Sequence, residues 1–170
     1  MLKKIQRIYD TIMTGIAAVL LTAMFFVLIA NVVLRLIPAV GGFKWYMEFS
    51  QYANVWAMLI GAAGIAAAGT NLRVEAVDGL FAKIPGGKKI SALIVDAALL
   101  VFYGFMIKSG SIIAVKAVQK VSTMPQFKMG QVYSIFPVAG VLCIIGTVLN
   151  ILVTLTSSGD EAENTEGSVV

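Results

Sequence analysis

Two charged residues, Asp96 and Lys108, stand inside an otherwise apolar stretch, which makes them the first candidates for chemistry. A charge at the centre of a membrane-spanning helix costs about 2.5–3.5 kcal/mol on insertion scales, so each needs a partner or a place near the membrane surface. They lie twelve positions apart, about 18 Å along a helix and about 120° around it, and therefore cannot pair with each other. We expect Lys108 to extend to one membrane face and Asp96 to bind a neighbouring helix or basic loop near the other. An ion or proton site is the alternative.

A second polar group, formed by Arg35, Trp45 and Glu48, surrounds the connection between the first two apolar segments. Glu48 stands at the predicted start of a helix, where the positive end of the helix dipole favours a carboxylate. Arg35 ends the preceding helix, close enough in sequence to pair with Glu48 across the hairpin. The pair would clamp the hairpin, and a docking point for another protein is the alternative.

The chain lacks residue types that several kinds of chemistry require. The chain has no histidine and one cysteine, Cys143, so a disulfide within the chain, a Cys/His zinc site and a bis-histidine haem lack their ligands. No nucleophile–base pair, metal-ligand cluster or phosphate-binding loop stands out. We therefore expect no enzyme activity and no cofactor in this chain. Lys and Arg build no continuous basic face, which argues against nucleic acid as a partner.

The elements that carry these residues are predicted to be membrane helices. Apolar residues make up 59% of the chain and charged residues 13%, against about 25% charged residues in a typical soluble domain. Lipid tolerates only structures whose backbone polar groups are satisfied internally, which favours a helical bundle. The first run covers about 36 Å as a helix, against a hydrocarbon core of about 30 Å. We predict an all-α, polytopic membrane protein with four transmembrane helices, over Thr11–Leu34, Phe49–Leu72, Ile90–Val115 and Met129–Gly159.

The segments between and after the spans complete the predicted organisation. Residues 73–84 combine charges with apolar residues at helical spacing, which predicts an amphipathic helix lying in the membrane interface between helices 2 and 3. Pro137 would either kink the last span or mark its first turn. Residues 1–156 form the predicted transmembrane domain, and 157–170 are a predicted acidic, disordered, cytoplasmic tail.

The distribution of cations suggests an orientation. Three Lys or Arg residues precede the first span and four lie between the second and third spans, against two and three in the other two loops. Cytoplasmic loops carry the excess of Lys and Arg, so this bias favours both termini in the cytoplasm.

Small residues are concentrated at the end of the second span. Ala62 with Ala66, and Gly64 with Ala68, obey the small-xxx-small spacing that lets helices approach closely in lipid. Packing inside the chain's own bundle and contact with another subunit both remain open interpretations.

The order of these features resembles the small membrane subunit (DctQ-type) of tripartite ATP-independent periplasmic, or TRAP, transporters, over nearly the whole chain up to about Thr156. Asn71 departs from the pattern, because many members have histidine there. The matching features begin with Arg35, which closes span one, and with the Trp-x-x-Glu of Trp45 and Glu48, which opens span two. Inside span two are Trp56 and the Gly-Ala-Ala of Gly61, Ala62 and Ala63, and its basic exit is formed by Gly69, Leu72, Arg73 and Val74. Pro85 follows in the next loop, and Tyr133 and Pro137 resemble the start of the family's last helix.

The resemblance implies a scaffold subunit of a secondary transporter in a bacterial or archaeal cytoplasmic (inner) membrane. Its implied partners are an extracytoplasmic substrate-binding protein, a large permease subunit and membrane lipid. The implied cargo is an organic acid of the dicarboxylate or sialic acid class, imported with sodium. The candidate subunit contacts are Arg35, Trp45, Glu48, Trp56, Gly61, Ala62, Gly64, Ala68 and Gly69.

Two other functions remain as alternatives. A stand-alone four-helix small-molecule exporter would need an essential buried carboxylate, for which Asp96 is the candidate. A membrane enzyme or redox subunit is disfavoured because histidine and paired cysteines are lacking.

Overall fold

The computed structural model describes residues 2–37, 41–69 and 87–166. Its regular secondary structure there is helical apart from one isolated bridge between Lys120 and Lys128, and irregular segments connect the helices. This agrees with the predicted all-α class. The helices are α1 (Leu2–Arg35), α2 (Tyr46–Ala68), α4 (Gly87–Lys116), α5 (Met129–Tyr133) and α6 (Ile135–Glu166).

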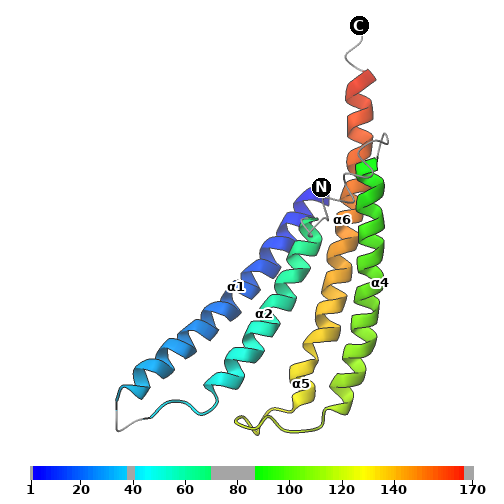
Figure 1. Ribbon diagram of the computed structural model, residues 1–170. Coiled ribbons are helices and arrows are strands. Elements are labelled where there is room, and N and C mark those ends of the chain that lie inside the picture. The colour runs from blue at the N-terminus through cyan, green and yellow to red at the C-terminus, as the bar shows by residue number, and fades with distance from the viewer. Residues whose placement is uncertain (1, 38–40, 70–86, 167–170) are drawn as a thin grey trace.

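The helices form an elongated array in which α2 and α6 are central (Figure 1). Helix α1 packs along α2, and α4 packs along α6. Helix α1 begins where α2 ends, and we call this the terminus end. Residues 41–45 and 117–128 lie at the opposite end, which we call the loop end. The α1–α2 and α4–α6 pairs lie closest near the terminus end and diverge toward the loop end (Figure 1).

Three helical stretches of the described chain are long and apolar enough to cross a membrane: Leu2–Arg35, Leu93–Lys116 and Met129–Thr156. They coincide with the first, third and fourth predicted spans. Helix α2 has 23 residues, about 35 Å of helix, and is long enough but less apolar. Its first half carries Ser50, Gln51 and Asn54, and its second half is rich in Ala and Gly. A central helix can keep such residues because neighbouring helices, rather than lipid, cover much of its surface.

The helix boundaries refine the predicted ones. Helix α1 starts at Leu2, so Lys3 and Arg7 lie on its first two turns, before the predicted span begins at Thr11. Helix α2 ends at Ala68, and Gly69 caps it in the left-handed conformation with φ of 65°. This conformation carries little cost for glycine because it lacks a Cβ atom. The predicted interfacial helix over residues 73–84 lies outside the described residues.

The last predicted span is divided into two helices. Helix α5 stops at Tyr133, and α6 restarts at Ile135 with Pro137 as its third residue. Pro137 thus occupies the first turn, where a missing backbone N–H breaks no helical hydrogen bond. Helix α6 then continues to Glu166, through most of the segment predicted as a disordered tail. Ala and Glu are strong helix formers and can extend an existing helix one hydrogen bond at a time.

Small side chains bring α2 close to both of its neighbours. On the α6 side, Ala63 and Ala67 are fully buried, and a Cβ atom at Gly146 would lie 2.7 Å from the Ala63 carbonyl oxygen. On the α1 side, a Cβ atom at Gly61 would lie 3.6 Å from that of Ala17. Gly61, Ala63 and Ala67 of this stripe therefore serve contacts within the chain.

The outer surfaces of the helices are apolar. Phe26 of α1 is 70% exposed, Met58 of α2 is 67% exposed and Phe105 of α4 is 65% exposed. Water would not stabilise such a surface, whereas lipid or another membrane protein would. This outward placement of large side chains fits the membrane location predicted from composition.

Candidate functional site

Glu48 joins α2 to the segment between α4 and α5 at the loop end. Its Oε2 atom accepts a hydrogen bond from the Thr123 backbone N–H at 3.0 Å and another from the Thr123 hydroxyl at 2.5 Å. Hydrogen bonds to an ionised carboxylate are stronger than neutral ones. The Glu48–Thr123 bridge therefore fixes a long connection against the start of α2.

Arg35 has a different neighbour from the one predicted. Its guanidinium carbon lies 5.7 Å from the centre of the Tyr46 ring, within the range of a cation–π interaction. The predicted clamp between Arg35 and Glu48 is therefore wrong, because Glu48 bonds to Thr123 instead. Thr123 lies 75 residues further along the chain, and no sequence pattern indicates that it contacts Glu48.

Aromatic rings surround the start of α2. Trp45 stacks on Phe43 with ring centres 5.2 Å apart and meets Phe49 edge-on at 5.6 Å. Further along α2, the Trp56 indole N–H donates a hydrogen bond to the Val132 carbonyl of α5 at 3.1 Å. Tryptophan and tyrosine suit the headgroup boundary of a membrane, because an apolar ring and a polar atom are satisfied together.

Two adjoining cavities open at the loop end. The first, which we call the charged hollow, measures about 450 Å³ and is lined by Arg35, Gly42, Phe43, Lys44, Tyr46, Met47, Glu48 and Thr123. The second, which we call the apolar groove, measures about 430 Å³ and is lined by Leu20, Phe49, Tyr52, Ala53, Trp56, Met124, Phe127, Gln131 and Val132. Both volumes fall in the range of small-molecule sites, about 300–1,000 Å³.

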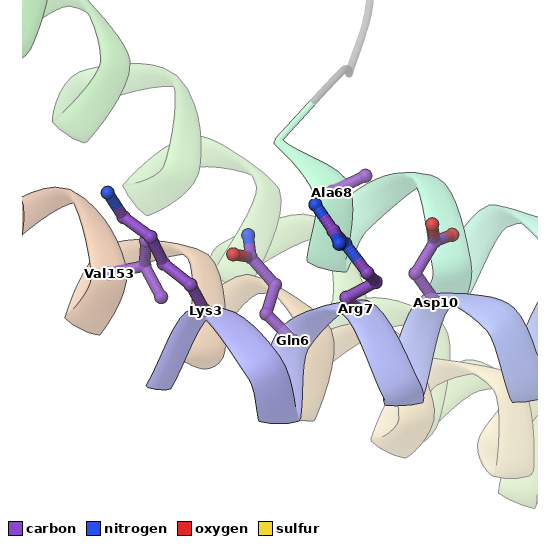
Figure 2. A pocket seen from close by; sticks show the side chains of 6 residues that line it. All are labelled: Lys3, Gln6, Arg7, Asp10, Ala68 and Val153. Carbon is purple, nitrogen blue, oxygen red and sulfur yellow. The ribbon is translucent and has the colours of Figure 1, made fainter. Parts of the chain in front are cut away.

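A third cavity lies at the terminus end between α1, α2 and α6 (Figure 2). It measures about 290 Å³ and is lined by Lys3, Gln6, Arg7, Asp10, Ala68 and Val153. The Gln6 side-chain amide donates a hydrogen bond to the Ala67 carbonyl at 2.5 Å, which satisfies a carbonyl in the last turn of α2. Figure 2 shows Arg7 reaching toward Ala68, where a cation complements the negative end of the helix dipole. Gln6 and Arg7 therefore interact with the C-terminal end of α2.

Asp96 is only 4% exposed and faces α6. Its Oδ2 atom accepts a hydrogen bond from the Asn150 side-chain amide at 3.1 Å. This is the neighbouring-helix contact expected for Asp96. A Cβ atom on Gly69 would collide with the same Asn150 side chain, so the glycine that caps α2 also makes room for the α4–α6 polar contact.

Lys108 lies on the exposed surface of α4. This exposure leaves room for the side chain to extend along the helix, and its extension to a membrane face stays a prediction. Asp96 and Lys108 are not brought together. An ion or proton site stays the alternative.

The predicted subunit contacts fall into two groups. Gly64 is buried against α1, where an added Cβ atom would lie 3.0 Å from an Asp10 carboxylate oxygen, and Gly69 is close to Asn150. These two positions serve the chain's own packing. The other predicted contacts are at least partly exposed: Arg35, Trp45, Glu48, Trp56, Gly61, Ala62 and Ala68.

Several polar residues that join the helices were missed from the sequence. Thr123 and Asn150 bind the two carboxylates, Gln6 binds the end of α2, and the Tyr9 hydroxyl donates to the Leu142 carbonyl at 2.8 Å. Asn150 could have been recognised, because an amide inside an uncharged span is costly without a partner. Thr123 stands in an irregular segment and carries no comparable signal.

Within the described ranges, no group of three or more Cys, Asp or Glu side chains is arranged to hold a metal ion. Several polar side chains join one helix to another, among them Tyr9, Trp56 and Asn150. The arrangement can hold a fixed shape in a membrane and present apolar surfaces and two loop-end cavities.

Comparison with known proteins gives one match. A family model described as "Tripartite ATP-independent periplasmic transporters, DctQ component" matches residues 24–157. Neither a curated protein nor a solved structure matches the chain.

Proposed function

The chain belongs to the DctQ component family of tripartite ATP-independent periplasmic transporters, and from this premise we propose that it is the small scaffold subunit of such a transporter. In this proposal a soluble extracytoplasmic binding protein delivers an organic acid, of the dicarboxylate or sialic acid class, to the membrane. A large permease subunit then moves the acid with sodium. The family match over residues 24–157 is the observation that carries the proposal.

The internal packing supports a scaffold role. The buried Asp96 and Asn150 side chains bond to each other and so join α4 to α6. Glycine and alanine bring the backbones of α2 and α6 together, which favours a single rigid arrangement. A rigid subunit is suited to hold part of a moving transporter in place.

The outward face of α2 is the proposed contact with the large permease. Met58 and Ile65 are 67% and 50% exposed, and Ala62 lies between them. These positions follow the i, i+4, i+7 spacing of one helix face. A small residue flanked by exposed large ones allows a partner helix to approach closely.

Co-purification with the large permease tests this contact. Ala62→Trp should reduce recovery of the large permease, because the indole would hold the partner helix away. Ala98→Trp on the exposed surface of α4 is the matched control and should leave recovery unchanged. Equal recovery for both variants would show that another face is used. Gly64→Leu is unsuitable, because it would first disrupt packing against Asp10 and Thr14 within the chain.

We further propose that all four long helices cross the membrane, with both termini in the cytoplasm. Cys143 is 2% exposed and can be removed as Cys143→Ala, giving a cysteine-free background. A membrane-impermeant maleimide applied to spheroplasts should label Lys44→Cys and Lys120→Cys but not Lys4→Cys. Labelling of positions 44 and 120 from opposite sides would contradict a membrane-crossing α2.

Transport by the chain alone would contradict the scaffold proposal. Liposomes that contain only this chain should show no uptake of an organic acid and no cation efflux. If they did transport, and Asp96→Asn abolished the activity, the exporter alternative would hold instead. The hydrogen bond from Asn150 to Asp96 gives that carboxylate a structural role in the present proposal.

A further inference from the structure

The loop end combines a polar cavity with an apolar one, and each has a different chemical preference. The charged hollow contains two cations, Arg35 and Lys44, and one carboxylate, Glu48. The apolar groove lies next to it, since Phe49 follows Glu48 and Met124 follows Thr123 in the linings of the two cavities. The Glu48–Thr123 bridge lies in the lining of the charged hollow.

The charge of this end favours an anionic group in the hollow. Arg35 and Lys44 are exposed, whereas the Glu48 carboxylate is partly buried and accepts both hydrogen bonds from Thr123. Lys120 and Lys128 lie opposite each other in the nearby connection and add two more exposed cations. Arginine and lysine bind phosphate oxygens through charge-assisted hydrogen bonds.

The apolar groove favours a hydrocarbon chain. It runs between α1, α2 and the 117–133 region and is lined mostly by aromatic and aliphatic side chains, with Ala53 and Leu20 on two of its walls. The Trp56 N–H is already bonded to the Val132 carbonyl, so the indole presents its apolar surface to the groove. Trp45 and Tyr46 mark this level as the headgroup boundary of a membrane.

We propose that these two cavities together bind one phospholipid, with its phosphate at Arg35 and Lys44 and an acyl chain in the apolar groove. The polar and apolar parts of such a molecule follow the same order as the two cavities. The lipid would fill the space where the α1–α2 and α4–α6 pairs diverge (Figure 1) and hold that separation fixed. This proposal does not depend on the proposed transport function.

Tryptophan fluorescence of the full chain in detergent tests the acyl-chain part. The chain has two tryptophans, and Trp45→Phe leaves Trp56 as the sole reporter in the groove. A phospholipid brominated on its acyl chain should quench Trp56 saturably, at one lipid per chain, and the unbrominated lipid should reverse the quenching. Ala53→Leu or Leu20→Phe should abolish the saturable quenching, because both fill the groove. Ala18→Leu, on the exposed surface of α1, is the control and should leave it unchanged.

The phosphate part is tested with the charged residues. Arg35→Gln with Lys44→Gln should weaken lipid binding at least about tenfold, from the loss of charge-assisted hydrogen bonds. Lys116→Gln, an exposed cation of α4 outside the hollow's lining, should leave binding unchanged. A brominated acyl alcohol without phosphate should bind as weakly as the lipid binds to the double variant. Inorganic phosphate alone should not displace the lipid at millimolar concentration.

Four results would overturn the proposal. Unsaturable quenching in the unmodified groove would mean that lipid contacts Trp56 only as bulk solvent. Insensitivity to both groove-filling variants, with helicity by circular dichroism retained, would place the acyl chain elsewhere. Equal binding by the phosphate-free alcohol would remove the role of Arg35 and Lys44. Complete loss of quenching after addition of the large permease would show that a protein segment occupies the groove.

Discussion

At Gly146, α6 lies close to the backbone of α2. A Cβ atom built at this position lies 2.7 Å from the Ala63 carbonyl oxygen and 3.0 Å from the Ala67 backbone nitrogen. Ordinary contacts of a Cβ atom begin at 3.4 Å, so Gly146→Ala requires a displacement of about 0.7 Å (3.4 − 2.7). Both neighbours are backbone atoms, which cannot rotate away as a side chain would.

The magnitude follows from comparison with a glycine in open space. Gly104 on α4 has no atom within 4 Å of an added Cβ atom, so Gly104→Ala is the matched control. Both substitutions gain the same helix propensity, about 0.5–1 kcal/mol, which cancels in the comparison. Overpacking costs about 1–3 kcal/mol, so we expect Gly146→Ala to have a lower free energy of unfolding than Gly104→Ala by about that amount. This is about a 5- to 150-fold difference in the folded-to-unfolded ratio.

Reversible unfolding in mixed detergent and dodecyl sulfate micelles, followed by far-UV circular dichroism, measures this difference. A second substitution, Ala67→Gly, removes the side-chain contact at 3.3 Å but leaves both backbone contacts. It should therefore not restore the stability of Gly146→Ala. A difference below about 0.5 kcal/mol between Gly146→Ala and Gly104→Ala would refute the inference that backbone contact at this position limits the α2–α6 distance.

Three further substitutions test the polar contacts between helices. Asp96→Ala should lower the free energy of unfolding by about 1–3 kcal/mol, because it leaves the buried Asn150 amide without this acceptor. Asp96→Asn should lower it less, because the asparagine keeps an oxygen there. An equal loss for both variants would contradict a hydrogen-bonding role for Asp96. Glu48→Ala should accelerate hydrogen exchange at the Thr123 amide, and Glu48→Gln should accelerate it less. Unchanged exchange in both variants would contradict the Glu48–Thr123 bridge. Thr147 is fully buried, and its hydroxyl oxygen has no hydrogen-bond partner, so Thr147→Val should leave thermal stability unchanged or raise it by up to about 1 kcal/mol. A loss of more than about 1 kcal/mol would show that the hydroxyl makes a bond.

The helical class and three of the helices could be predicted from the sequence because their signal is local. An uncharged apolar run of membrane length has few stable alternatives to a helix, whatever its neighbours are. The first, third and fourth predicted spans therefore agree with apolar helices of the structure. Helix α2 was predicted as a helix from the same signal, but its Ser50, Gln51 and Asn54 make it less apolar than the others. Its central position, which the sequence does not encode locally, accounts for that composition.

The partners of individual side chains depended on contacts between distant parts of the chain. Arg35 and Glu48 are close in sequence and opposite in charge, so local reasoning paired them, whereas the fold places Tyr46 and Thr123 beside them. The prediction that Asp96 binds a neighbouring helix was more accurate, because a buried carboxylate requires a neighbouring donor. That this donor is Asn150 depends on the packing of α4 on α6.

The small residues of α2 mark the same boundary between sequence and tertiary structure. Their spacing by itself determined that a helix would approach closely, because small side chains permit backbone contact in lipid. It could not determine which helix, since α1, α6 and a foreign subunit all satisfy that requirement equally. Only the tertiary structure decided it, by turning Gly64 toward α1 and placing Ala63 and Ala67 against Gly146 of α6.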